Sequence, residues 1–135
     1  MVSVVVNMDA QLDESSVDDV SQCEDGIVTR GRELLNAAER HELRDTFDDI
    51  LRPLGLYTRL VVLDRANSIA LYFICMTLSS VLSLRELWRC GQLQNVIQIL
   101  FTFLSGASQP VLVHRLSWPL SDDERCRIFF GLLSS

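Results

Sequence analysis

Apolar and polar positions alternate over several short stretches of the chain. Residues 57–76, YTRLVVLDRANSIALYFICM, have the pattern of two apolar strands joined by a polar turn at residues 64–68. Alternate valines predict another strand over residues 2–8, and residues 110–118, which begin with proline, predict a fourth. The second strand of the hairpin is apolar on both faces: one carries Ile69, Leu71, Phe73 and Cys75, the other Ala70, Tyr72 and Ile74.

Helical spacing of apolar residues appears in two longer stretches. Residues 29–52 predict a first amphipathic helix, ended by Pro53 and Gly55. Residues 79–104 predict a second helical region with a break near Gly91 and an end at Gly106. Its later half has the clearest apolar stripe: Leu93, Val96, Ile97, Leu100, Phe101 and Leu104. A capping-box pattern at residues 121–124 opens a short apolar helix over 128–133. Residues 9–28, acidic and without periodicity, predict a flexible loop.

The order strand, helix, strand, strand, helix, strand predicts an α+β fold. We expect a ferredoxin-like βαββαβ two-layer sandwich with a four-stranded antiparallel sheet and an added C-terminal helix, all in one domain spanning residues 1–135. Right-handed crossovers place both connecting helices on the same face of the sheet. By alternation, the other face carries Val5, Val61, Leu63, Ala70, Tyr72 and Ile74, with Tyr57 and Arg59 at its rim. In the fourth strand either Val111 and Val113 or Leu112 and Leu116 face inward.

Charge is distributed unevenly along the 135 residues. The net charge is −6, but seven of the eighteen carboxylates precede the first basic residue, Arg30. The remainder holds 11 acidic residues and 12 arginines, so the folded body is nearly neutral. A protein that binds nucleic acid needs a basic face. The sequence therefore indicates no nucleic-acid partner.

The residue types that carry chemistry are sparse and scattered. The two histidines, His41 and His114, and the four cysteines stand far apart, without metal-ligand spacing, and no nucleotide-binding or hydrolase motif occurs. We therefore expect no catalytic residue, no metal and no cofactor. The longest apolar run, residues 69–84, is interrupted by polar residues and too short to span a membrane. With no signal peptide in evidence, we expect a cytosolic protein.

Three segments together resemble the N-terminal domain of the TNF receptor type 1-associated death domain adaptor family. They are residues 60–76, LVVLDRANSIALYFICM, residues 83–104, SLRELWRCGQLQNVIQILFTFL, and residues 110–126, PVLVHRLSWPLSDDERC. The resemblance implies an α/β sandwich that binds the TRAF domain of TNF receptor-associated factors through an exposed sheet face. The positions matching that site are Val5, Asn7, Leu63, Asp64, Arg65, Ala70 and Tyr72. The family has aromatic residues on the first strand where this chain has valines.

The residue pattern and the resemblance indicate the same surface. We expect a non-enzymatic signalling adaptor, of the kind that acts in TNF receptor signalling and apoptosis, which docks a protein partner on an apolar sheet face with Tyr72 as its anchor. One alternative is a ferredoxin-like regulatory or ligand-binding domain that forms a homodimer through that face. Another is that the C-terminal helix folds back over the sheet and leaves no site there.

Overall fold

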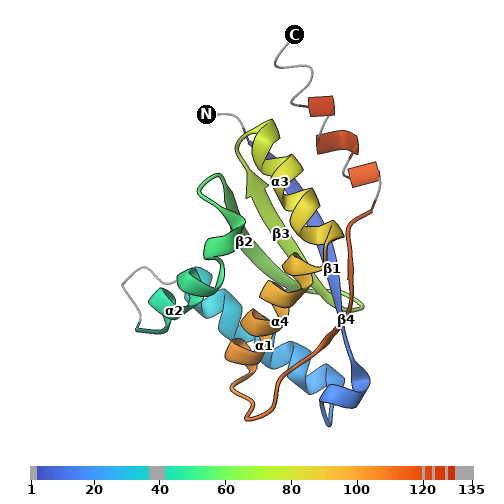
Figure 1. The fold of residues 1–135 in the computed structure, drawn as a ribbon. Coiled ribbons are helices and arrows are strands. Elements are labelled where there is room, and N and C mark those ends of the chain that lie inside the picture. Colours follow the sequence, from blue (N-terminus) through green and yellow to red (C-terminus); the bar gives the residue numbers. More distant parts are fainter. Residues whose placement is uncertain (1–2, 37–41, 120, 123, 127, 130–135) are drawn as a thin grey trace.

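The structure is a computed structural model, and it describes residues 3–36, 42–119, 121–122, 124–126 and 128–129. Within these ranges, four strands and four α-helices are delimited, and further helical residues follow the last strand (Figure 1). They are β1 (Val4–Leu12), α1 (Val20–Leu35), α2 (Glu42–Ile50), β2 (Thr58–Arg65), β3 (Ile69–Cys75), α3 (Leu78–Arg89), α4 (Gln92–Ser105) and β4 (Val113–Ser117), with short 3-10 helices η1 (Glu14–Ser16) and η2 (Arg52–Leu54).

The strands form one antiparallel sheet in the order β2-β3-β1-β4. The predicted α+β class and the four-stranded antiparallel sheet are confirmed. Each helical connection joins two strands with another strand between them, so β3 separates β1 from β2, and β1 separates β3 from β4. Each connection contains two helices, where the sequence analysis expected one helix before β2 and one, broken near Gly91, before β4.

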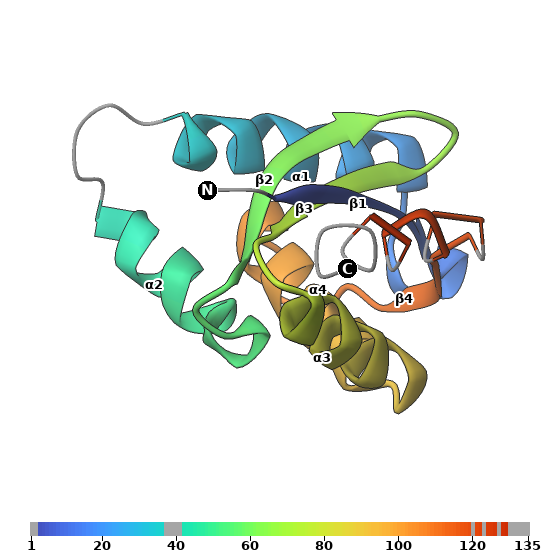
Figure 2. The same cartoon turned by 90° about the horizontal axis from the view of Figure 1, so that it is seen from above.

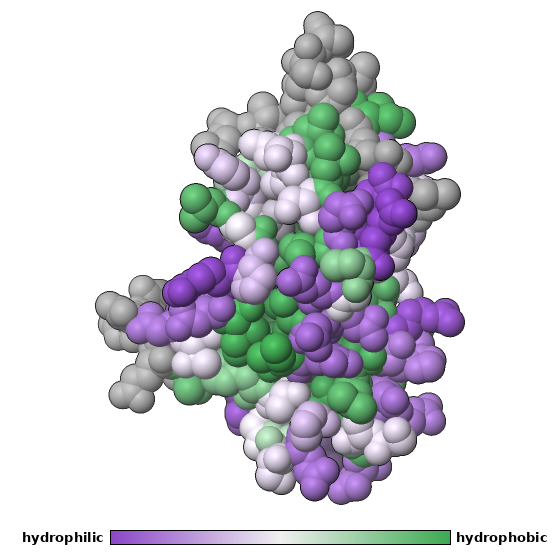
Figure 3. Space-filling view, viewed as in Figure 1, coloured by the Kyte–Doolittle hydropathy of each residue, from purple (hydrophilic) through white to green (hydrophobic). Residues whose placement is uncertain are grey.

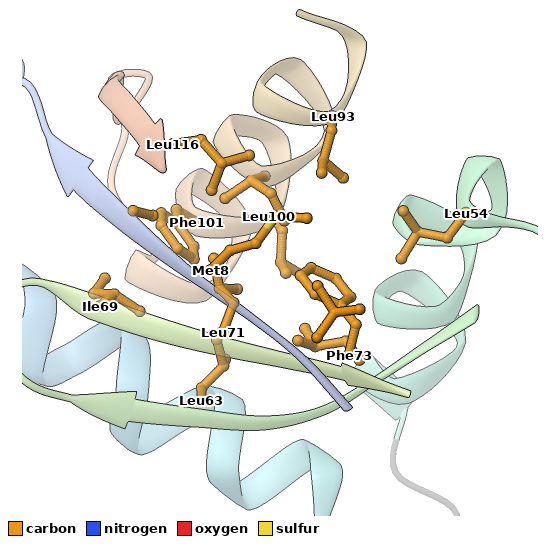
Figure 4. Close-up of a cluster of buried hydrophobic side chains, with 14 of the residues drawn as sticks. Met8, Leu54, Leu63, Ile69, Leu71, Phe73, Leu93, Leu100, Phe101 and Leu116 are labelled. Atoms are coloured by element: carbon orange, nitrogen blue, oxygen red, sulfur yellow. The ribbon is translucent and has the colours of Figure 1, made fainter. Parts of the chain in front are cut away.

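The hydrophobic core lies between the sheet and the helices, chiefly α4 and α1. Along β1, alternate residues from Val4 to Leu12 are buried, and their neighbours in sequence are more exposed. In Figure 4, Met8, Leu71 and Phe73 of the sheet point toward Leu100 and Phe101 of α4. All six residues of the predicted stripe in α4 are buried. The stripe therefore faces the sheet, as its spacing predicts.

The boundary between α3 and α4 is set by one glycine. Thr77 caps the start of α3, because its side chain accepts a hydrogen bond from the backbone N–H of Ser80, and the Ser80 hydroxyl accepts one from Thr77 N–H. Gly91 then has φ of 84°, a left-handed conformation that suits glycine, and Gly106 ends α4 with φ of 67°. The predicted break and stop are confirmed.

The predicted loop over residues 9–28 is wrong. The first strand continues to Leu12, because Asp9 and Ala10 pair with β3 on one side and β4 on the other. The helix α1 begins at Val20, where the Asp19 side chain accepts a hydrogen bond from Gln22 N. The predicted helix over 29–52 is accordingly two helices, α1 and α2, and the residues that connect them lie partly outside the described ranges.

The last strand is shorter than predicted, and neither predicted orientation describes it fully. Val111, Val113 and Leu116 are all buried, whereas Leu112 is 42% exposed. A register shift between Gln11 and Leu12 breaks the simple alternation. After β4, the described residues from 121 to 129 are helical, which starts earlier than the predicted helix over 128–133, most of which lies outside the described residues.

None of the helices within the described residues has the length and apolar character that a membrane span requires.

Candidate binding face

One face of the sheet is turned away from the core, and we call it the open face. It carries alternate residues of the three strands β2, β3 and β1, arranged in rows by their pairing register. Arg59, Ile74 and Val5 form the first row, Val62, Tyr72 and Asn7 the second, and Asp64, Ala70 and Asp9 the third. Gln11 and Arg115 continue the face toward β4.

The first two rows contain a cluster of apolar side chains. Val5 and Val62 are 45% and 43% exposed, and Tyr72 and Ile74 between them are half-buried. Directly opposite residues on neighbouring strands have Cβ atoms about 4.5–5.5 Å apart, so these four side chains are neighbours. The sequence analysis placed Val5, Tyr72 and Ile74 on this face correctly.

The strand β2 contains an irregularity that reverses part of the prediction. The register shifts between Leu60 and Val62, so Val61 is an extra residue without a partner on β3. Leu63 consequently faces the helices and is fully buried, and Val62 takes the exposed position. The assignment of Leu63 to the open face is wrong. Val61 is half-buried at the bulge, and the site residue that alternation missed is Val62.

Asp64 and Arg65, the two charged residues at the turn of the hairpin, both bind other residues of this chain. Arg65 lies on the helical side, where it forms ion pairs with Glu24 (3.2 Å) and Asp25 (2.8 Å) of α1. Asp64 accepts hydrogen bonds from Arg32 of α1 and from the backbone N–H of Arg65. Arg65 is therefore not part of the open face, and Asp64 is a rim residue with its own partner.

Ala70 is on the open face by register but does not offer contact area. It is 4% exposed, between Asp9 and Asp64 on the neighbouring strands. Its methyl group therefore cannot contribute much to a docking surface. The contact of Ala70 with a partner stays a prediction, and the exposed apolar area lies in the first two rows.

Asn7 lies beside Tyr72 and contains the one buried side-chain oxygen or nitrogen atom, Oδ1, that has no hydrogen-bond partner in the described part of the chain. A buried acceptor without a donor costs about 1–3 kcal/mol. Asn7 is half-buried and adjoins exposed apolar side chains. Because Oδ1 itself is buried, it is an unpaired acceptor inside the sheet and adds no exposed contact area to the apolar cluster.

The segment after β4 binds the edge of the sheet. Asp122 accepts hydrogen bonds from Asn7 N (3.3 Å) and from Trp118 Nε1 (2.9 Å), and Arg125 donates to Val5 O. These bonds occupy backbone groups of β1 that β4 is too short to pair. Val5 nevertheless stays 45% exposed. The described residues of this segment thus extend the edge of β1 and leave the apolar cluster uncovered.

Electrostatics on the helical side is dominated by one buried carboxylate. Glu24 is 5% exposed, and burial raises its pKa, although the nearby Arg65 guanidinium opposes that shift. The pair joins α1 to the end of the hairpin. Because it lies on the helical side, we interpret it as structural.

Other surfaces offer less organised candidates. His114 is exposed on β4, and His41 lies outside the described residues. Within the described part of the chain, no three histidine, cysteine or carboxylate side chains gather closely enough to hold a metal ion. On the side where α3 and α4 lie in front, hydrophobic residues also reach the surface among hydrophilic ones (Figure 3), and Ile99 of α4 is 54% exposed. Ile99 therefore provides a comparison for the open face.

No protein-family model matches this chain, and comparison with curated proteins and with solved structures likewise gives no match.

Proposed function

We propose that the protein is a non-enzymatic interaction module that works in the cytosol and docks a protein partner on the open face. The observation that carries this proposal is the cluster of Val5, Val62, Tyr72 and Ile74. These apolar side chains adjoin one another across three strands, on the face opposite the helices. Clustered exposed apolar groups of this kind mark interaction sites more often than single exposed ones.

The partner's surface must match both the apolar cluster and its polar neighbours. An apolar patch would cover Tyr72 and Val62. A specific interface buries about 1,200–2,000 Å² in total, so contact would extend to Arg59, Gln11 and Arg115 around the cluster. The TRAF domain, implied by the sequence resemblance, is the partner we propose.

The test is titration calorimetry with a purified TRAF domain. The Val62→Asp and Tyr72→Asp variants should abolish measurable binding, because each places a charge within the apolar contact. Ile99→Asp makes the same kind of change at an exposed residue of the helical side and should bind like the wild type. Val62 is more exposed than Tyr72, so its variant tests the site even if Tyr72→Asp unfolds.

Two results would contradict the proposal. Loss of binding in Ile99→Asp alone would move the site to the helical side. A tight wild-type dimer in light scattering that Val62→Asp dissociates, together with no TRAF binding, would make a second copy of the chain the occupant of the open face.

A further inference from the structure

Charges of opposite sign flank the apolar cluster of the open face. The strands β2, β3 and β1, which Figure 2 shows from above, carry this face. Arg59 begins the first row, beside Ile74. In the third row two carboxylates, Asp64 and Asp9, lie on either side of the small Ala70. The second row, between them, carries no charged residue, so the face is basic at one end and acidic at the other.

The Arg59 guanidinium is the unpaired charge at the basic end. Arg65, at the other end of the same strand, forms ion pairs with Glu24 and Asp25 of α1. Arg59, by contrast, is exposed and forms no ion pair with any residue that the structure describes. A partner that covers the first row removes part of the water around this charge, and a carboxylate placed opposite offsets that loss of hydration.

The Asp9 carboxylate is the unpaired charge at the acidic end. Asp64, in the same row, is bound by Arg32 of α1. Asp9 is half-buried on the central strand β1, opposite Ser117 of β4. Arg115 is a diagonal neighbour of Asp9 by register, but Asp9 forms no ion pair within the described ranges. A basic group of a partner can therefore approach this carboxylate.

The distance between the two charges follows from the geometry of the sheet. Asp9 lies about 13 Å beyond Val5 along β1, and two strand spacings, about 10 Å, separate β1 from β2. The Cα atoms of Arg59 and Asp9 are therefore roughly 16 Å apart, at opposite corners of the cluster. This exceeds the screening length of about 8 Å at physiological ionic strength, so the charges do not neutralise each other. One partner can contact both, because each side of a standard interface covers about 800 Å².

We propose that the partner carries an acidic group opposite Arg59 and a basic group opposite Asp9, and that these two charges fix the orientation in which it docks. The apolar cluster supplies a non-directional attraction and so does not select one orientation. The reverse orientation places like charges together, which weakens it. This inference rests on the function proposed above and names the chemistry of the partner's surface.

The first test is titration calorimetry of an Arg59 variant with the TRAF domain at low ionic strength. Arg59→Glu should weaken binding about tenfold, because it turns an attraction into a repulsion. Arg30→Glu, the same change of net charge at an exposed residue of α1, should bind like the wild type. Raising the salt concentration to about 0.5 M should reduce the difference, because salt screens exposed charges.

A second set of variants tests the acidic end. Asp9→Asn removes the charge with little change in side-chain size, so it leaves the central strand intact. It should weaken binding about threefold, less than the reversal at Arg59, because it removes an attraction without adding a repulsion. Glu33→Gln makes the same change at an exposed residue of α1 and should bind like the wild type. Thermal melts of all variants check that each one is folded.

The orientation itself is tested by reversing charges on both proteins. Reversal of one acidic residue of the TRAF domain should restore binding to Arg59→Glu, and reversal of one basic residue should restore binding to Asp9→Lys. The two restoring positions should be different and roughly 16 Å apart on the TRAF domain, which matches the separation on the open face.

The possible failures have separate meanings. No binding of the TRAF domain by the wild type would overturn both the proposed function and this inference. Wild-type binding that Val62→Asp abolishes, with equal affinities for Arg59→Glu and Arg30→Glu, would leave the function standing and overturn the orienting charges. Restored binding of Arg59→Glu by any charge reversal on the TRAF domain, without preference for acidic positions, would also overturn them.

Discussion

The two faces of β3 contrast the core with the surface within one strand. Leu71 and Phe73 face the helices and are fully buried, whereas Tyr72 and Ile74, next to them in sequence, are half-buried on the open face. All four residues are hydrophobic, so hydrophobicity alone does not distinguish the two faces. The helices α1 and α4 pack on only one face, and that choice separates residues buried in the core from residues that stay partly exposed.

The largest expected difference between the two faces is in stability. Phe73→Ala should lower the free energy of unfolding by about 3–5 kcal/mol, because it removes a ring from the packed core and leaves a cavity. Ile74→Ala should lower it much less, because part of that side chain is already in water. Urea denaturation measures both. Similar losses would mean that the open face is covered.

A second prediction concerns how closely α1 packs against β2, on the face of the sheet that the helices cover. A Cβ atom on Gly31 would clash with Leu63 Cδ1, so Gly31→Ala should destabilise the fold by about 1–3 kcal/mol. Gly26, in the same helix, has nothing within 4 Å of an added Cβ atom, and Gly26→Ala should stabilise the fold by up to about 1 kcal/mol. Thermal melts should show shifts of opposite sign. A stabilised Gly31→Ala variant would show that Leu63 does not pack there.

A third prediction concerns the outer edge of β4, where a side chain of α4 binds the strand backbone. Gln98→Ala should destabilise the fold by about 1 kcal/mol, because it leaves Val113 N without an acceptor. Gln92, exposed at the start of α4, gives a control with a similar change in side-chain volume. Amide exchange at Val113 should rise in Gln98→Ala only. Unchanged exchange there would show that the glutamine does not close this edge.

The smallest expected effect is a pH dependence on the helical side. Burial raises the pKa of Glu24, so the folded chain holds this proton more tightly than the unfolded chain does. Stability contributed by the protonated carboxyl is present below the ordinary glutamate pKa, about 4.3, and is lost as pH rises through the higher folded pKa. The stability of Glu24→Gln relative to wild type should therefore increase from about pH 4 toward neutrality. A relative stability that falls over this range would contradict the raised pKa.

Much of the fold could be predicted from the chain because local signals were strong. The stripe from Leu93 to Leu104 matched one helical face, and Gly91 and Gly106 marked its ends through their left-handed conformations. The hairpin of β2 and β3 followed from two apolar runs around a polar turn. By contrast, α1 was placed too late because its buried face includes Gly31, which contributes little to an apolar pattern.

The candidate site was predicted only in part, and the errors have a common cause. Alternation placed Val5, Tyr72 and Ile74 on the open face, but it assumed a regular β2. Four consecutive apolar residues, 60–63, leave the register of that strand open, and pairing with β3 decided that Val61 is the extra residue. Leu63 and Val62 exchanged faces as a result.

The sequence by itself determined the hairpin of β2 and β3 and the helix α4 with its two ends, since periodicity and glycines act within a few residues. The tertiary structure decided which strand groups remain unpaired and which apolar side chains remain exposed. Those outcomes depend on contacts between distant segments, such as Arg32 with Leu63 and Gln98 with Val113. A backbone group is satisfied or left free by whatever packs beside it, and local sequence does not encode that neighbour.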